Sequence, residues 1–119
     1  MHPITMVLAS LVALEHLYIF YLESLVPQSR QTAKVFGLSE ANQANPTVIT
    51  LFKNQGAYNL GLALAMAYGL VTGNRELVTL FALFVAGVAT YGALTSSPKI
   101  LLTQGGPALL TLLSLLILR

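Results

Sequence analysis

Three ionisable residues lie in an otherwise apolar stretch near the N-terminus, ALEHLYIFYLE at residues 13–23. They are Glu15, His16 and Glu23, which account for two of the four acidic residues and one of the two histidines in the chain. In low-dielectric surroundings a carboxyl group holds its proton more tightly, and a neighbouring imidazole exchanges protons near neutral pH. Glu15 and His16 are therefore candidate acid/base residues, suited to isomerising or hydrating a lipophilic substrate.

Other chemistries fit these residues less well. On a helix, adjacent Glu15 and His16 point about 100° apart, and His16 and Glu23 lie about 10 Å apart along the axis. Neither pair would readily share one metal ion, so we predict no metal site and no cofactor. Axial ligation of a haem by His16, at an interface between copies, is an alternative that no second motif supports. Nucleophilic catalysis is not indicated, because the chain has no cysteine and no apparent serine–histidine–acid spacing.

The composition of the chain indicates a membrane protein. Of the 119 residues, 55% are hydrophobic and only 8% are charged, whereas about 25% are charged in an average soluble domain. The mean hydropathy is +0.75. So few charges do not cover the surface of a soluble fold of this size. The net charge of +2 comes from scattered basic residues, which does not suggest nucleic-acid binding. The partners we expect are membrane lipids and a second copy of the chain.

Four long apolar segments are predicted to cross the membrane as helices, at about residues 4–25, 46–71, 75–94 and 98–118. Each is close to the roughly 20 residues that span a bilayer core. The predicted fold is all-α, a four-helix integral membrane bundle in which the whole chain forms one transmembrane domain. The one long connection is the loop at 26–45, in which a brief interfacial helix is expected over Thr32 to Leu38.

Residues that cap helices mark the ends of these segments. The pairs concerned are Asn45-Pro46, Gly73-Asn74 and Ser97-Pro98. Asparagine or serine suits the position before a helix, proline its first turn, and glycine the position after its end. Within the fourth segment, Pro107 follows Gly105-Gly106 and is expected to kink the helix and expose backbone carbonyls. Small residues at four-residue spacing, Gly61-Ala65-Gly69 and Ala82-Ala86-Thr90, predict close helix packing.

The basic residues favour one orientation of the chain in the cell membrane. The side of the first and third loops carries Arg30, Lys34, Lys53 and Lys99, and the opposite side carries Arg75 and Arg119. Because basic residues are enriched in cytoplasmic loops, the first and third loops are expected in the cytoplasm and both termini outside.

Polar residues of all four segments fall in the same half of the bilayer, beside the first and third loops, and are expected to line one pocket. The predicted ligand-binding residues are Glu23, Asn54, Gln55, Tyr58, Asn59, Tyr91 and Gln104. Glu15 or His16 is expected to hydrogen-bond to the second segment, and Glu23 to lie at the mouth of the pocket, near water. The other half of the bilayer is expected to be almost purely apolar.

Four motifs follow one another along the chain: EHLYIFYLE, NQGAYN, Tyr91-Gly92, and QGGPA from Gln104 to Ala108. In this order and spacing they resemble a bacterial and fungal family of small four-helix membrane proteins, domain-of-unknown-function family 1304. The resemblance covers essentially the whole chain and implies an integral membrane protein, without an established activity or functional residues. The stretch Ser24-Leu25-Val26-Pro27 departs from the aromatic residues that often follow the second Glu in that family.

Several functions fit the predicted pocket. It would bind a small lipophilic molecule or a lipid, with or without acid/base chemistry, so the sequence leaves open whether the protein is an enzyme. The same residues would serve a subunit of a proton-coupled small-molecule transporter. The third reading is structural: a polar network would then only fix how the helices pack. A co-purified ligand would distinguish a binding pocket from the other two.

Overall fold

The structure, a computed structural model, describes residues 1–118 and their side chains apart from that of Ile100. Every regular element within these residues is helical, which confirms the predicted all-α class. In chain order the elements are α1 (Pro3–Phe20), η1 (Tyr21–Leu25), α2 (Arg30–Phe36), α3 (Glu40–Ala44), α4 (Pro46–Val71), α5 (Arg75–Thr95), α6 (Lys99–Thr103) and α7 (Gly105–Ile117). Arg119, on which the predicted orientation partly depends, lies outside the described residues.

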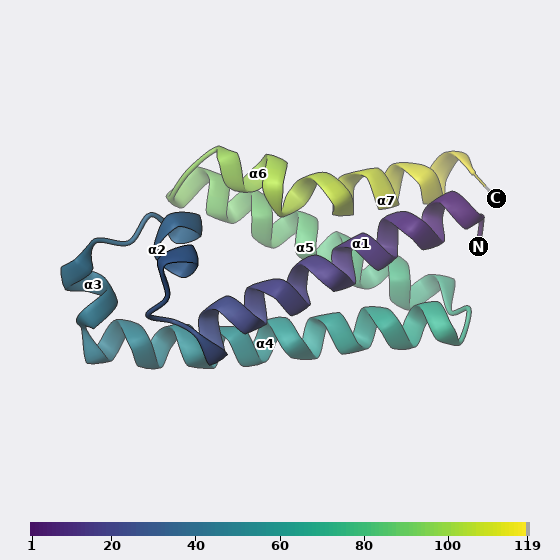
Figure 1. The fold of residues 1–119 in the computed structure, drawn as a ribbon. Helices are drawn as coiled ribbons and strands as arrows, with labels where there is room; N and C mark the ends of the chain where they lie inside the picture. The colour runs from purple at the N-terminus through teal and green to yellow at the C-terminus, as the bar shows by residue number, and fades with distance from the viewer. Residues whose placement is uncertain (119) are drawn as a thin grey trace. The chain divides into compact units, whose positions relative to one another are not determined.

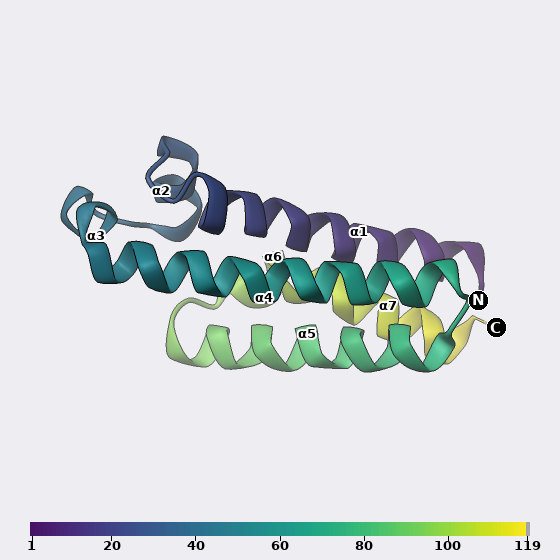
Figure 2. The same cartoon turned by 90° about the horizontal axis from the view of Figure 1, so that it is seen from below.

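The chain divides into two compact units. One contains Met1–Glu15 and the chain from Ala63 onwards, and the other is His16–Leu62. Helices α1 and α4 each contribute to both units. Within the first unit, α6 and α7 run alongside α5, as both views show (Figures 1 and 2).

Small side chains bring the helices of the first unit together. Fully buried alanines line the contact, among them Ala82, Ala89 and Ala108. A Cβ on Gly105 would lie 3.1 Å from Ala89 Cβ, so α7 begins in direct contact with α5. A Cβ on Gly61, by contrast, would meet no atom of another element within 4 Å, so only part of the predicted row of small residues on α4 is used in packing.

The half of the bundle away from the first and third loops was expected to be almost purely apolar, and that expectation was wrong. It contains buried hydroxyl side chains that are joined by hydrogen bonds. Thr5 on α1 and Ser114 on α7 share a hydrogen bond of 2.8 Å between their hydroxyls, and both side chains are buried. Ser114 also donates to the Thr111 carbonyl, and Thr111 donates to that of Pro107. Hydroxyls of Ser and Thr can bond the carbonyl one turn back in their own helix, so they enter an apolar interface at little cost.

Capping groups end α4 and start α5. Asn74 N–H donates to Gly69 O and Gly73 N–H to Leu70 O, with Gly73 at φ +65°. These two hydrogen bonds form a Schellman motif, which needs a residue in the left-handed conformation after the helix. The Asn74 side chain then accepts a bond from Leu77 N–H at 3.1 Å and caps α5. The turn between α4 and α5 thus follows from Gly73-Asn74, as predicted.

The fourth predicted segment is two helices, because the chain departs from helical hydrogen bonding at Gln104. Pro107 is the third residue of α7 rather than the centre of a long helix. Pro107 has no N–H to donate to the carbonyl four residues back, which is that of Thr103, so helical hydrogen bonding is interrupted there. The break at Gln104 thus lies in the turn before Pro107, where a distortion was expected.

Residues 26–45 form two short helices rather than a plain loop. Ser29 accepts a bond from Thr32 N–H at 3.1 Å and starts α2, and Gly37 ends it at φ +65°. The expected helix over 32–38 is thus present but starts earlier. Ser39 caps α3 in the same way, through a bond from Asn42 N–H at 3.1 Å.

Two helices are long and apolar enough to cross a membrane, namely Pro3–Leu25, which joins α1 and η1, and α5. In the most apolar 18-residue stretch of each helix, only 33% of the first and 28% of the second is buried inside the structure. The core helix of a soluble protein would be mostly buried, whereas both of these helices have several large apolar side chains exposed. Of the other two predicted spans, α4 carries the polar NQGAYN stretch and α7 has 13 residues.

Candidate functional site

The acid nearest the end of the first span, Glu23, lies in a π-helical turn. Residues Tyr21–Leu25 form this turn, and Val26 N–H donates to Tyr21 O at 3.1 Å, five residues back. Such turns are rare and occur frequently at functional sites, because the extra residue re-aims side chains. The turn directs Glu23 inward, where its side chain is only 1% exposed. Our expectation that Glu23 lies near water at a pocket mouth was therefore wrong.

Asn59 on α4 is the hydrogen-bond partner of this buried acid. Its amide Nδ2 donates to Glu23 Oε1 at 2.7 Å and also lies 3.2 Å from the Gln55 carbonyl oxygen, one turn back. A buried carboxyl group is tolerated when polar partners replace water. Of the residues proposed from the sequence, the structure brings Glu23 and Asn59 together directly.

At Gly56, α4 approaches η1 closely. The Ser24 hydroxyl donates to the Lys53 carbonyl at 2.8 Å. A Cβ built on Gly56 would lie 2.0 Å from Ser24 Oγ, a distance that no real side chain tolerates. The sequence analysis missed Gly56, although a glycine inside the polar NQGAYN motif is the kind of signal that marks a close approach.

Thr32 closes the end of the π-helical turn. Its hydroxyl lies 3.0 Å from the Leu22 carbonyl and 2.7 Å from the Val26 carbonyl, and the side chain is fully buried. The last carbonyls of a helix have no partner within it, so a docked hydroxyl replaces the missing donor. Thr32 was predicted only as the start of a surface helix. Its role depends on a contact that sequence spacing does not show.

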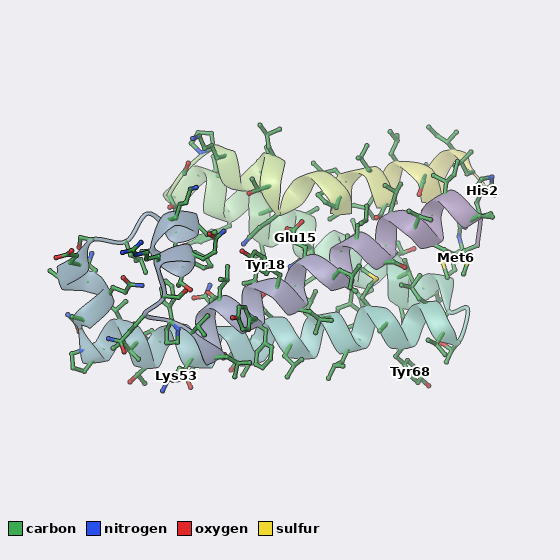
Figure 3. The ribbon with its side chains drawn as sticks, in the orientation of Figure 1. His2, Met6, Glu15, Tyr18, Lys53 and Tyr68 are labelled. Carbon is green, nitrogen blue, oxygen red and sulfur yellow. The ribbon has the colours of Figure 1, made fainter. Side chains whose placement is uncertain are left out.

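Glu15 lies two turns before Glu23 and is in a different situation. Its side chain is half-buried, and its Oε1 atom is buried without a hydrogen-bond partner among the described residues. Figure 3 shows it within one turn of Tyr18 on α1. The hydroxyl of Tyr18 accepts a bond from Gln31 Nε2 at 3.1 Å. A side-chain hydrogen bond between the first and second predicted segments is made by Glu23, which accepts from Asn59.

The remaining predicted residues are more exposed than a shared pocket requires. His16 is buried at 4% exposure, and Gln104 is half-buried. The exposed ones are Asn54, Gln55, Tyr58 and Tyr91. Tyr58 is 82% exposed although its neighbour Asn59 faces η1, because successive residues on a helix point about 100° apart. The polar cluster on α4 therefore does not face one side.

Comparisons with known proteins place the chain in a family. The family model described as "Protein of unknown function (DUF1304)" matches residues 10–116. The uncharacterized protein YpaA of Lactococcus lactis subsp. lactis (strain IL1403) is 45% identical over 113 residues, which cover 93% of this chain and 95% of YpaA. No solved structure matches the chain. The resemblance drawn from the four polar motifs is confirmed, and the chain belongs to the DUF1304 family of proteins of unknown function.

Proposed function

We propose that the protein is an integral membrane protein that binds a small amphiphile through Glu15. Insertion is supported by the two apolar helices and their outward-facing side chains. In this proposal α4 and the α6–α7 pair also cross, as a four-helix bundle. The stretch from Lys99 to Ile117 reaches about 28 Å at 1.5 Å per residue, close to the roughly 30 Å of a bilayer core. The basic residues favour a cytoplasmic location for the first and third loops.

The observation that carries the binding function is the buried Oε1 atom of Glu15, which has no hydrogen-bond partner among residues 1–118. A buried polar atom without a partner costs about 1–3 kcal/mol, and more if it is charged. A ligand that donates an N–H or O–H to this oxygen would remove that cost. We therefore infer a ligand with a hydroxyl or amine head that bonds this oxygen and an apolar tail.

Glu23 does not carry this role, because its Oε1 atom already accepts the Asn59 amide. The proposal gives the two acids different tasks: Glu23 joins η1 to α4, and Glu15 receives the ligand. A ligand bound at Glu15 is also compatible with acid/base chemistry at that carboxyl, since a bound amine or alcohol carries a proton next to it.

The test compares three probes of equal tail length: decylamine, decanol and decyl methyl ether, which has no donor. Binding to the purified protein is followed by native mass spectrometry. We expect decylamine and decanol to bind and the ether not to bind. Glu15→Ala should abolish binding of both, and Glu15→Gln should keep decanol, because the amide retains an acceptor oxygen.

The control variant is Glu76→Gln, which removes an exposed acid in the first turn of α5 and should leave binding unchanged. Equal binding of all three probes to the wild type would show partition into an apolar surface and refute the proposal. Binding that persists in Glu15→Ala, with helix content unchanged by circular dichroism, would refute it as well.

A further inference from the structure

Helix α2 carries two cations on the face opposite to the one by which it docks. Arg30 and Lys34 are one turn apart, differ by about 40° around the helix, and are both exposed. Thr32 and Phe36 are also one turn apart and lie about 120–160° from the two cations around the helix. Thr32 is fully buried and Phe36 is half-buried. The helix therefore has a docked face and a charged face.

The docked face of α2 makes contacts with η1 and α4 that fix the orientation of the helix. Besides the bonds of Thr32 to the end of η1, the Phe36 ring packs edge-on against Phe52 of α4, with 5.2 Å between ring centroids. Gln31 adds the bond to the Tyr18 hydroxyl on α1. With these anchors in place, the side chains of Arg30 and Lys34 are exposed.

The position of α2 along the chain puts these cations at the end of an apolar span. The span Pro3–Leu25 ends four residues before Ser29, which caps α2. Tyr18, which is exposed and lies seven residues before the end of the span, is joined to α2 through Gln31. Tyrosines are enriched at the level of lipid headgroups, so α2 lies at this level if the span is inserted.

Two electrostatic contributions on α2 are unfavourable. Arg30 occupies the first turn, where the helix dipole disfavours a cation, and Lys34, although favoured by the dipole in the last turn, is a like charge one turn from Arg30. Between residues 26 and 45 the only acid is Glu40, which belongs to α3. A bound anion would offset both unfavourable terms.

We infer that the charged face of α2, Arg30 and Lys34, binds the phosphate of an anionic phospholipid. Arginine suits this partner because its planar guanidinium donates two hydrogen bonds to a phosphate at once. Each basic residue near an anionic leaflet contributes a modest attraction, and two together strengthen binding on the order of 30-fold. This inference shares membrane insertion with the proposed function, but it concerns a different site and ligand.

The experiment titrates the purified full-length protein in detergent with phosphatidylglycerol and with phosphatidylcholine of the same acyl chains, followed by native mass spectrometry. We expect the wild type to prefer phosphatidylglycerol. Arg30→Gln/Lys34→Gln should bind it on the order of 30-fold more weakly. The control Lys53→Gln/Lys99→Gln removes the same charge from two other exposed positions and should bind as the wild type does.

Two further arms make the outcome decisive. Arg30→Lys/Lys34→Arg keeps both charges and should retain the preference for phosphatidylglycerol. Inorganic phosphate should compete poorly, because it lacks the acyl chains that hold a lipid beside α2. Equal loss in the two charge-removing variants would assign the effect to net charge and overturn the inference. So would a wild type without preference, or competition by phosphate as strong as by the lipid.

Discussion

Two glycines on α4 should respond in opposite directions to the same substitution. A Cβ on Gly56 would lie 2.0 Å from Ser24 Oγ, 3.0 Å from Ser24 Cβ and 3.1 Å from Ser24 N, whereas a Cβ on Gly61 meets nothing within 4 Å. Both glycines lie inside the same helix, so replacing either by alanine brings the same gain in helix propensity. The difference between the two variants therefore isolates the contact between η1 and α4.

The expected changes in the free energy of unfolding follow from three contributions. The gain in helix propensity is about 1 kcal/mol at either site. At Gly56, overpacking costs about 1–3 kcal/mol and the displaced hydrogen bond of Ser24 about 1 kcal/mol more. Gly56→Ala should thus destabilise the fold by about 1–3 kcal/mol, and Gly61→Ala should stabilise it by about 1 kcal/mol.

Thermal unfolding in detergent, followed by the helical circular dichroism signal, measures the difference. At about 4 °C per kcal/mol, Gly56→Ala should lower Tm by about 4–12 °C and Gly61→Ala should raise it by about 4 °C. Adding Ser24→Ala to Gly56→Ala should recover part of the loss, because it removes the nearest atom and leaves the Cβ and backbone contacts. Equal shifts for the two glycine variants would refute the close approach of η1 and α4.

Three smaller perturbations probe other contacts, each by the same thermal unfolding measurement. Thr32→Val should destabilise the fold by about 1–3 kcal/mol, because it removes the donor beside two carbonyls at the end of η1; an unchanged Tm would contradict the docking of α2. Asn74→Ala should cost about 1 kcal/mol through the lost bond from Leu77 N–H, and Asn74→Gly only a few tenths, so equal losses would argue against the cap. Thr5→Val should cost only about 0.6 kcal/mol, because Ser114 keeps its bond within α7, and a loss several times larger would mean that the hydroxyl pair organises the contact between α1 and α7.

Local signals in the sequence were enough to predict much of the secondary structure. Asn45-Pro46 and Gly73-Asn74 mark the ends of α4 because their side chains and backbone conformations act on the nearest turn. A distortion before Pro107 was predicted, but its division of the segment into two helices at Gln104 was not, since Gly105-Gly106-Pro107 permits either a kink or a new helix start. The sequence alone does not decide between these two, because packing of Gly105 against Ala89 contributes to the choice.

The candidate site was harder to predict than the helices. Glu23 was predicted to lie near water because it is close to the end of the first apolar segment. The π-helical turn contains an extra residue, so the side chains after Phe20 point in other directions than they would in a regular α-helix. Nothing in YLESL marks such a turn locally. It is held by Thr32 and by the contact with α4, which are distant in the sequence.

This turn also separates the roles of the two acids that the sequence groups together. Both lie in ALEHLYIFYLE and were predicted to contribute to one polar pocket. The structure gives Glu23 an amide donor from α4 and nearly complete burial, so this acid has a partner within the fold. Glu15, in the regular part of α1, has a buried oxygen without a partner among the described residues. A buried acceptor is stable only when something donates to it, so a donor from outside the chain is expected at Glu15 rather than at Glu23.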